Sequence, residues 1–128
     1  MGAGATLEVL DLDLPGHSSG KVRESWTLDG GGRLRLLAQC SPAGLLRNAD
    51  NLTMSPWGDL VVCEDTLARC GLIGLTRDGR QYPIAVNSYT TSELAGATFS
   101  PDGRTLFVNI QDRGLTLAID GPWPASAG

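Results

Sequence analysis

An internal repeat of about 45 residues constrains the fold of this chain more than any other feature. The segment Leu52–Val62 resembles Ala97–Val108. In each segment a short run of strand-forming residues leads into Ser-Pro-x-Gly, and a strongly apolar run follows. Proline suits the second position of a β-turn, and glycine suits the fourth. A period of this length with short strands predicts β-propeller blades, while a small β-sandwich with two similar hairpins is the alternative.

Turn-forming residues point to the same fold class. The chain holds 17 glycines among 128 residues, which is well above the usual frequency and favours an all-β architecture with many turns. Asp29–Gly32 and Asp78-Gly79 each stand between two short strand-like runs, so each predicts a hairpin. Pro83 lies in the returning strand of the second hairpin. Since proline cannot donate to a strand ladder, that strand is expected at a sheet edge.

The N-terminal part has a weaker pattern. Residues 6–14 alternate loosely between apolar and acidic side chains, which predicts a strand. Residues 15–20, rich in proline, glycine and serine, predict a loop that carries His17, the single histidine of the chain. We therefore divide the chain into residues 1–49, with N-terminal strands and a blade hairpin, and residues 50–128, with the repeated blades. At about 45 residues per blade the chain is too short for a closed ring, which needs about four to eight blades, so we predict a partial β-propeller.

Charge and hydropathy exclude several classes of protein. The chain has 10 Lys and Arg against 14 Asp and Glu, a net charge of −4, which argues against binding to nucleic acid. No run of 18 apolar residues is present, so no membrane-spanning helix is expected. The first 14 residues show neither the basic start nor the apolar centre of a signal peptide.

Carboxylates follow the apolar runs at comparable places. The run Leu60–Val62 ends in Cys63 and Glu64, and a charge at the end of a buried strand needs a partner. Asp50 and Glu93 precede the two repeated hairpins. Hard cations such as calcium take carboxylate oxygens, so Asp50, Glu64 and Glu93 are candidate metal ligands. The alternative is that these carboxylates cap turns and accept hydrogen bonds from backbone N–H groups.

The sequence leaves open the roles of one cysteine and of two amide side chains. An odd number of cysteines gives no complete set of disulfides. Cys63 is either a soft metal ligand or a small buried apolar residue. Asn109 and Gln111, near the end of the run Thr105–Ile110, either line a channel or satisfy backbone groups.

Several longer strings resemble the C-terminal part of the PhoX-type alkaline phosphatases. The resemblance runs from about Asp50 to Trp123. It rests on the following strings, which occur in the order and spacing of that family: Asp50-Asn51-Leu52-Thr53, Pro56–Asp65, Glu93-Leu94-Ala95-Gly96-Ala97, Phe99–Gln111 and Gly121-Pro122-Trp123.

The resemblance implies a six-bladed propeller, of which this chain supplies about two to three blades. It implies a periplasmic or secreted enzyme, exported through the twin-arginine route, that hydrolyses phosphate monoesters with calcium and iron in the central channel. By motif position, Asp50, Glu64 and Glu93 are the candidate metal ligands here, and no catalytic residue is assigned.

The sequence departs from the family by lacking its upstream blades, among them the one with the iron-binding cysteine. Cys63 is therefore not identified with that residue, and the chain alone is expected to be inactive. The competing interpretation is a non-catalytic propeller fragment or interaction module, because TolB-like and WD40-like propellers also use Ser-Pro-Asp-Gly-Arg.

Overall fold

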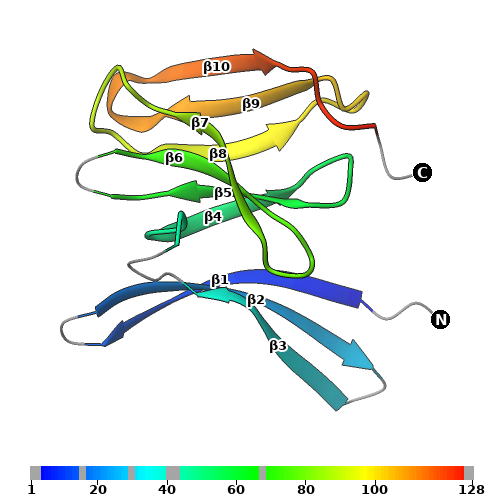
Figure 1. Cartoon of the computed structure of the whole chain (residues 1–128). Coiled ribbons are helices and arrows are strands. Elements are labelled where there is room, and N and C mark those ends of the chain that lie inside the picture. Colours follow the sequence, from blue (N-terminus) through cyan, green and yellow to red (C-terminus); the bar gives the residue numbers. More distant parts are fainter. Residues whose placement is uncertain (1–3, 15–16, 29–30, 40–43, 67–68, 126–128) are drawn as a thin grey trace.

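The described chain folds into three antiparallel sheets, stacked one upon another (Figure 1). The computed structural model describes residues 4–14, 17–28, 31–39, 44–66 and 69–125, and for the first three strands it describes the path and pairing of the backbone. The first sheet has the order β1-β2-β3, with β1 Gly4–Leu14, β2 His17–Leu28 and β3 Gly31–Gln39. The middle sheet has the order β4-β5-β6-β7, with β4 Ala49–Met54, β5 Leu60–Glu64, β6 Gly71–Leu75 and β7 Gln81–Val86. The third has the order β8-β9-β10, with β8 Leu94–Phe99, β9 Thr105–Ile110 and β10 Leu115–Asp120.

The predicted all-β fold class is confirmed. A three-residue 3-10 helix, Gln111–Arg113, joins β9 to β10. Within the described ranges, no helix has the length and apolar character needed to cross a membrane.

The internal repeat forms two equivalent hairpins, β4–β5 and β8–β9. In the first turn the N–H of Gly58 donates to the carbonyl of Ser55 at 3.1 Å, and in the second the N–H of Gly103 donates to Ser100 at 2.8 Å. Both glycines have positive φ, 95° at Gly58 and 72° at Gly103, a conformation that other residues adopt at a cost. The repeated Ser-Pro-x-Gly strings are therefore β-turns, as their residues predict.

The Asp78-Gly79 turn joins β6 to β7, and β7 lies at the edge of the middle sheet, as Pro83 predicts. Pro83 pairs with Ile73. The next pair inward joins Ala85 to Leu72, so Ile84 is an extra residue in β7 and forms a bulge. Proline and bulge together make this edge a poor template for another strand.

In the N-terminal sheet, the strand expected over 6–14 is present as β1. The prediction of a loop over residues 15–20 is wrong for residues 17–20. There the strand β2 begins at His17, which pairs with Leu14. Serine, glycine and histidine carry the same backbone donor and acceptor as any other residue, so the ladder continues through them toward the turn. Residues 15 and 16 lie outside the described ranges.

The two central strands of the middle sheet, β5 and β6, are buried on both faces. Every residue of β5 and β6 is buried, and the side chains of β5 alternate between two apolar clusters. Leu60 and Val62 face a cluster that includes Ala38 of β3, whereas Val61 and Cys63 face the third sheet. The two clusters contain the following buried residues: Ala38, Leu46, Ala49, Leu60, Val62, Ile73 and Leu75 in one, and Val61, Cys63, Leu72, Leu94, Ala97, Leu106, Val108 and Ile110 in the other. This double burial explains why the strands read as continuous apolar runs.

Aromatic rings join the middle and third sheets where the repeated turns lie. The indoles of Trp57 and Trp123 stack with their centroids 5.5 Å apart, and Phe99 meets both rings edge-on. The indole N–H of Trp123 donates to the carbonyl of Arg104 at 2.7 Å. We call Trp57, Phe99 and Trp123 the aromatic end of the molecule.

A glycine is required where the ring of Tyr82 crosses β6. A Cβ atom on Gly74 would lie 2.1 Å from Cζ of Tyr82, far inside van der Waals contact. We predict that Gly74→Ala lowers the free energy of unfolding by about 1–3 kcal/mol, because the ring must move.

The control for Gly74→Ala is Gly114→Ala, measured by the same urea titration. Gly114 has a φ of 59°, and no atom lies within 4 Å of the place that a Cβ on it would take, so alanine there tests backbone conformation alone. It should cost about 1–2 kcal/mol. Unchanged stability of the Gly74→Ala chain would contradict the close packing of Tyr82.

Candidate functional site

Four carboxylates lie at the ends of strands remote from the repeated turns. They are Asp50 in β4, Glu64 at the end of β5, Asp65 directly after it, and Glu93 directly before β8. We call these four residues the acidic end. By strand direction, the acidic end and the aromatic end lie at opposite ends of the β4–β5 and β8–β9 hairpins.

A bulge sets the position of Asp50. Ala49 pairs with Glu64 and Asn51 pairs with Cys63, so Asp50 is the extra residue in β4. A bulge interrupts the two-residue alternation of side chains and changes the direction in which one of them points. Asp50 is exposed, although it lies within a strand between Ala49, which is buried, and the half-buried Asn51.

Glu64 is a buried carboxylate held by the backbone. The residue is only 5% exposed, and its Oε1 accepts a hydrogen bond from the N–H of Arg47 at 2.8 Å. Oε2 lies 3.1 Å from the place that a Cβ on Gly71 would take, so the missing side chain of Gly71 makes room for it. Burial raises the pKa of Glu64, and hydrogen bonds from the N–H groups of Arg47 and Gly71 oppose the rise. These contacts are those of the backbone-binding alternative.

Glu93 lies within electrostatic reach of Asp50 and Asp65. Burial raises the pKa of Glu93, and the negative charges of Asp65 and Asp50 raise it further. Of the three candidate ligands, the fold thus brings Asp50 and Glu93 together and turns Glu64 toward backbone amides. Asp65 was not among the candidates, although its place beside Glu64 at a strand end carries the same signal. Among the residues that the structure describes, no three His, Cys, Asp or Glu side chains are grouped closely enough to hold an ion.

Cys63 is a buried thiol. The pKa of the Cys63 thiol is raised to about 11, mainly by burial. A hydrogen bond from the N–H of Ala97 lowers this pKa, and the negative charges of Asp50 and Glu93 raise it. Cys63 is fully buried in the cluster between the middle and third sheets. Its surroundings disfavour the thiolate that a soft metal would need, and they match the interpretation of Cys63 as a small buried apolar residue.

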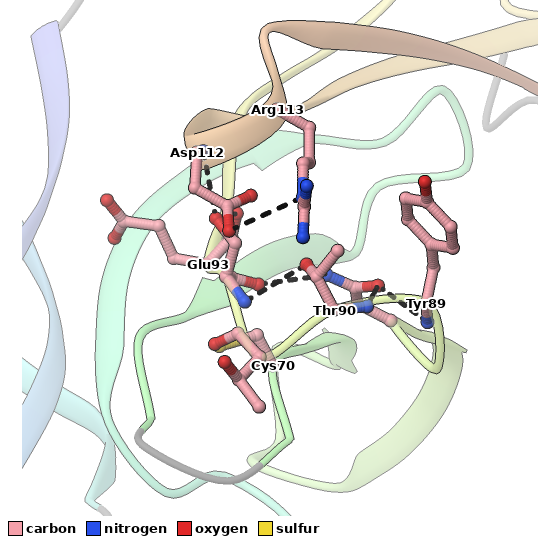
Figure 2. A network of polar contacts seen from close by, with 9 residues as sticks. Cys70, Tyr89, Thr90, Glu93, Asp112 and Arg113 are labelled. Atoms are coloured by element: carbon pink, nitrogen blue, oxygen red, sulfur yellow. Dashed lines mark hydrogen bonds and ion pairs between the residues drawn. The ribbon is translucent and has the colours of Figure 1, made fainter.

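The loop before Glu93 is ordered by one buried amide, Asn87. Its Oδ1 accepts hydrogen bonds from the N–H groups of Tyr89 and Thr90, both at 3.1 Å. Its Nδ2 donates to Oγ1 of Thr90 at 3.0 Å and to the carbonyl of Ser92 at 2.9 Å. Figure 2 labels Tyr89 and Thr90 of this loop, together with Glu93. Because the loop leads from the edge strand β7 to β8, Asn87 fixes the path on which Glu93 lies.

The 3-10 helix after β9 holds the same loop from the other side (Figure 2). The N–H of Asp112 donates to Oγ of Ser92 at 3.1 Å, and the N–H of Gln111 donates to the carbonyl of Glu93 at 3.4 Å. The hydroxyl of Ser92 and the carbonyl of Glu93 are therefore both held by the helix that joins β9 to β10.

Asn109 binds a backbone group, which is the second of the two roles expected for it. Its Nδ2 donates to the carbonyl of Ala95 at 3.2 Å, across a bulge at which Gly96 has a φ of 65°. A Cβ on Gly96 would lie 2.9 Å from the same Nδ2. The Glu-Leu-Ala-Gly string thus needs its glycine both for the left-handed backbone and for the approach of the amide.

Comparison with known proteins identifies the family. The family model described as alkaline phosphatase PhoX matches residues 24–114, about seven tenths of the chain. The chain belongs to the PhoX alkaline phosphatase family. No curated protein and no solved structure matched in the corresponding searches.

The PhoX family match begins earlier than the resemblance read from the sequence. It starts within β2, whereas the shared strings begin at Asp50. It includes all four residues of the acidic end and stops before β10. The predicted membership of the PhoX family is confirmed.

The acidic end predicts an unusual response to pH in the metal-free chain. Since the pKa of Glu93 is raised in the folded state, the folded chain holds this proton more tightly than the unfolded chain does. Stability from Glu93 is therefore fully present below the ordinary carboxylate range and is lost as pH rises through it. We predict that Glu93→Gln raises the unfolding midpoint at about pH 7 and changes it less at about pH 4.

Asp102→Asn is the matched control, with the opposite sign. Hydrogen bonds from the hydroxyl of Ser100 and the N–H of Arg104 lower the pKa of Asp102, so its charge stabilises the fold at neutral pH. Urea titrations with chelator present should show Asp102→Asn losing stability at about pH 7. A loss of stability in Glu93→Gln as well would contradict repulsion at the acidic end.

Proposed function

We propose that this chain is the C-terminal part of a PhoX-type phosphatase that hydrolyses phosphate monoesters, and that its sheets are blades of a β-propeller. The arrangement of the first strands supports the propeller. β4 packs against both β1 and β8, so the first strand of each sheet adjoins that of the next. Propeller blades surround a central channel, and adjoining first strands are what that arrangement requires. Three layers also favour blades over a two-sheet sandwich.

The acidic end is our proposed contribution to a metal centre. The observation that carries the proposal is that the charges of Asp65 and Asp50, at the end of the middle sheet, raise the pKa of Glu93, which directly precedes the third sheet. A cation would remove this repulsion. Carboxylate oxygens suit calcium in type, so Asp50 and Glu93 are proposed ligands, together with Glu64. When bound, the cation would supply charge neutralisation to a phosphate monoester.

The thiols of the described chain do not fit an iron site. Cys63 and Cys70 are both buried, and the surroundings of Cys63 raise its pKa to about 11. Any iron in the complete enzyme would then take its ligands from other residues. We propose that the acidic end is one part of a larger site, and that residues outside this chain complete it. Family membership also leads us to propose a periplasmic or secreted location.

We predict that the purified chain does not hydrolyse a chromogenic phosphate monoester, with or without added calcium and iron. Phosphoryl transfer needs several positioned cations, and we propose that part of their ligands lies elsewhere. Turnover that survives repurification and is lost with chelator would show that the chain is an enzyme by itself. Co-expression with the missing blades should restore activity; failure to do so would favour the non-catalytic interaction module.

The role of Glu64 is tested by Glu64→Gln in the complete enzyme. If Glu64 is a ligand, the folded variant loses bound calcium and activity together. If it serves backbone amides alone, glutamine keeps an oxygen for the N–H of Arg47, and metal content stays unchanged. Asp50→Asn is the comparison, because Asp50 is exposed and its loss should affect metal content with little effect on stability. Metal analysis and urea unfolding of both variants separate the two roles.

A further inference from the structure

Arg47 is a cation held beside the acidic end. It lies shortly before β4, and its backbone N–H donates to Oε1 of Glu64 at 2.8 Å. The next residue, Asn48, is bound to the residue that follows β5. Its carbonyl accepts a hydrogen bond from the N–H of Asp65 at 2.9 Å, and its Nδ2 donates to the carbonyl of Asp65 at 2.6 Å. These contacts fix the backbone of Arg47 next to two carboxylates of the acidic end.

The charge of Arg47 acts on the acidic end. It lowers the pKa of Glu64, although burial raises that pKa by more. The charged groups that act on Glu93 and on Cys63 are all negative. Arg47 therefore brings positive charge to a part of the molecule where the other charges that act on these groups are carboxylates.

The guanidinium of Arg47 is available to a ligand. Arg80 and Arg113 each form an ion pair with a neighbouring aspartate. Arg47 is exposed, and within the described ranges it forms no ion pair. A guanidinium presents five N–H donors in a planar fork and stays charged at any ordinary pH. Such a fork matches the oxygens of a phosphate group.

We propose that the guanidinium of Arg47 binds the non-bridging oxygens of the phosphate group of the substrate. This inference rests on the proposed phosphatase function. A phosphate monoester carries close to two negative charges at neutral pH, and the carboxylates of the acidic end repel it. Arg47 supplies an opposite charge next to them. Two parallel hydrogen bonds from the fork also fix the orientation of the phosphate group, which a single ammonium group does not.

The alternative is that the side chain of Arg47 serves Glu64 alone. Its charge would then favour the ionised carboxylate, and substitution of Arg47 would affect stability or metal content rather than the affinity for phosphate. The hydrogen bond to Glu64 comes from the backbone N–H, so it survives any substitution at position 47 except proline. Variants of Arg47 thus remove the guanidinium and keep this contact.

Binding of inorganic phosphate to this chain, co-expressed with the missing blades, tests the proposal without requiring turnover. Arg47→Gln should raise the dissociation constant of phosphate and the KM of a chromogenic monoester by about tenfold or more, because hydrogen bonds between charged groups are lost. Arg47→Lys should fall between Arg47→Gln and the parent, since lysine keeps the charge and lacks the fork. Calcium content should equal that of the parent in both variants.

Arg104→Gln is the matched control. Arg104 is also exposed, its N–H donates to Oδ1 of Asp102 at 3.1 Å, and its charge lowers the pKa of Asp102. Its carbonyl, however, is bound by Trp123 of the aromatic end. Replacing Arg104 should leave the phosphate affinity and the KM unchanged.

Three results would overturn the role of Arg47. They are unchanged phosphate affinity in Arg47→Gln, an equal loss of affinity in Arg104→Gln, and a loss of calcium that accompanies the loss of phosphate binding. Each would leave the proposed phosphatase function standing as long as the parent complex turns over. A parent complex that neither binds phosphate nor hydrolyses the monoester would contradict the proposed function itself, and the role of Arg47 with it.

Discussion

The burial of β5 and β6 on both faces is the constraint on which the rest of the structure depends. Two strands without a polar face cannot lie at the surface, because exposing them would leave their apolar side chains in water. The chain meets this need with one sheet below and one above (Figure 1). The repeated hairpins follow from the same need, since the third sheet covers the middle one with a copy of its own first two strands.

Bulges in β4 and β8 change the direction of individual side chains within the otherwise regular sheets. A strand without interruption sends every second side chain into a core. The extra residue at Asp50 breaks that rule at the edge of a buried cluster and leaves a carboxylate exposed beside Glu93. The second repeat has its own bulge at Gly96, held by Asn109. Asp50 therefore joins the acidic end because the ladder is irregular there, while the other three carboxylates lie where strands begin or end.

The sequence predicted those elements whose residues leave the backbone little choice. Ser-Pro-x-Gly and Asp-Gly fixed the turns, Pro83 fixed the edge, and the shared strings identified the family. The extent of β2 was missed, because polar side chains do not prevent backbone pairing. The bulge at Asp50 and the contact of Glu64 with the N–H of Arg47 could not be predicted, since both depend on a register between segments distant in sequence. For the same reason the sequence indicated three candidate carboxylates but not that two of them, Asp50 and Glu93, lie close enough to repel each other.

The contact between the two repeated turns has a consequence for how such a chain can grow. Gly103 of the second turn lies against Pro56 of the first, and a Cβ on Gly103 would come within 2.9 Å of the proline ring. The contact joins unlike positions of two like units, proline of one to glycine of the next. Pro101, the equivalent proline of the second unit, is exposed. A further unit that packed on the third sheet in the same way would place its own turn glycine against Pro101, so one type of contact can join each unit to the next.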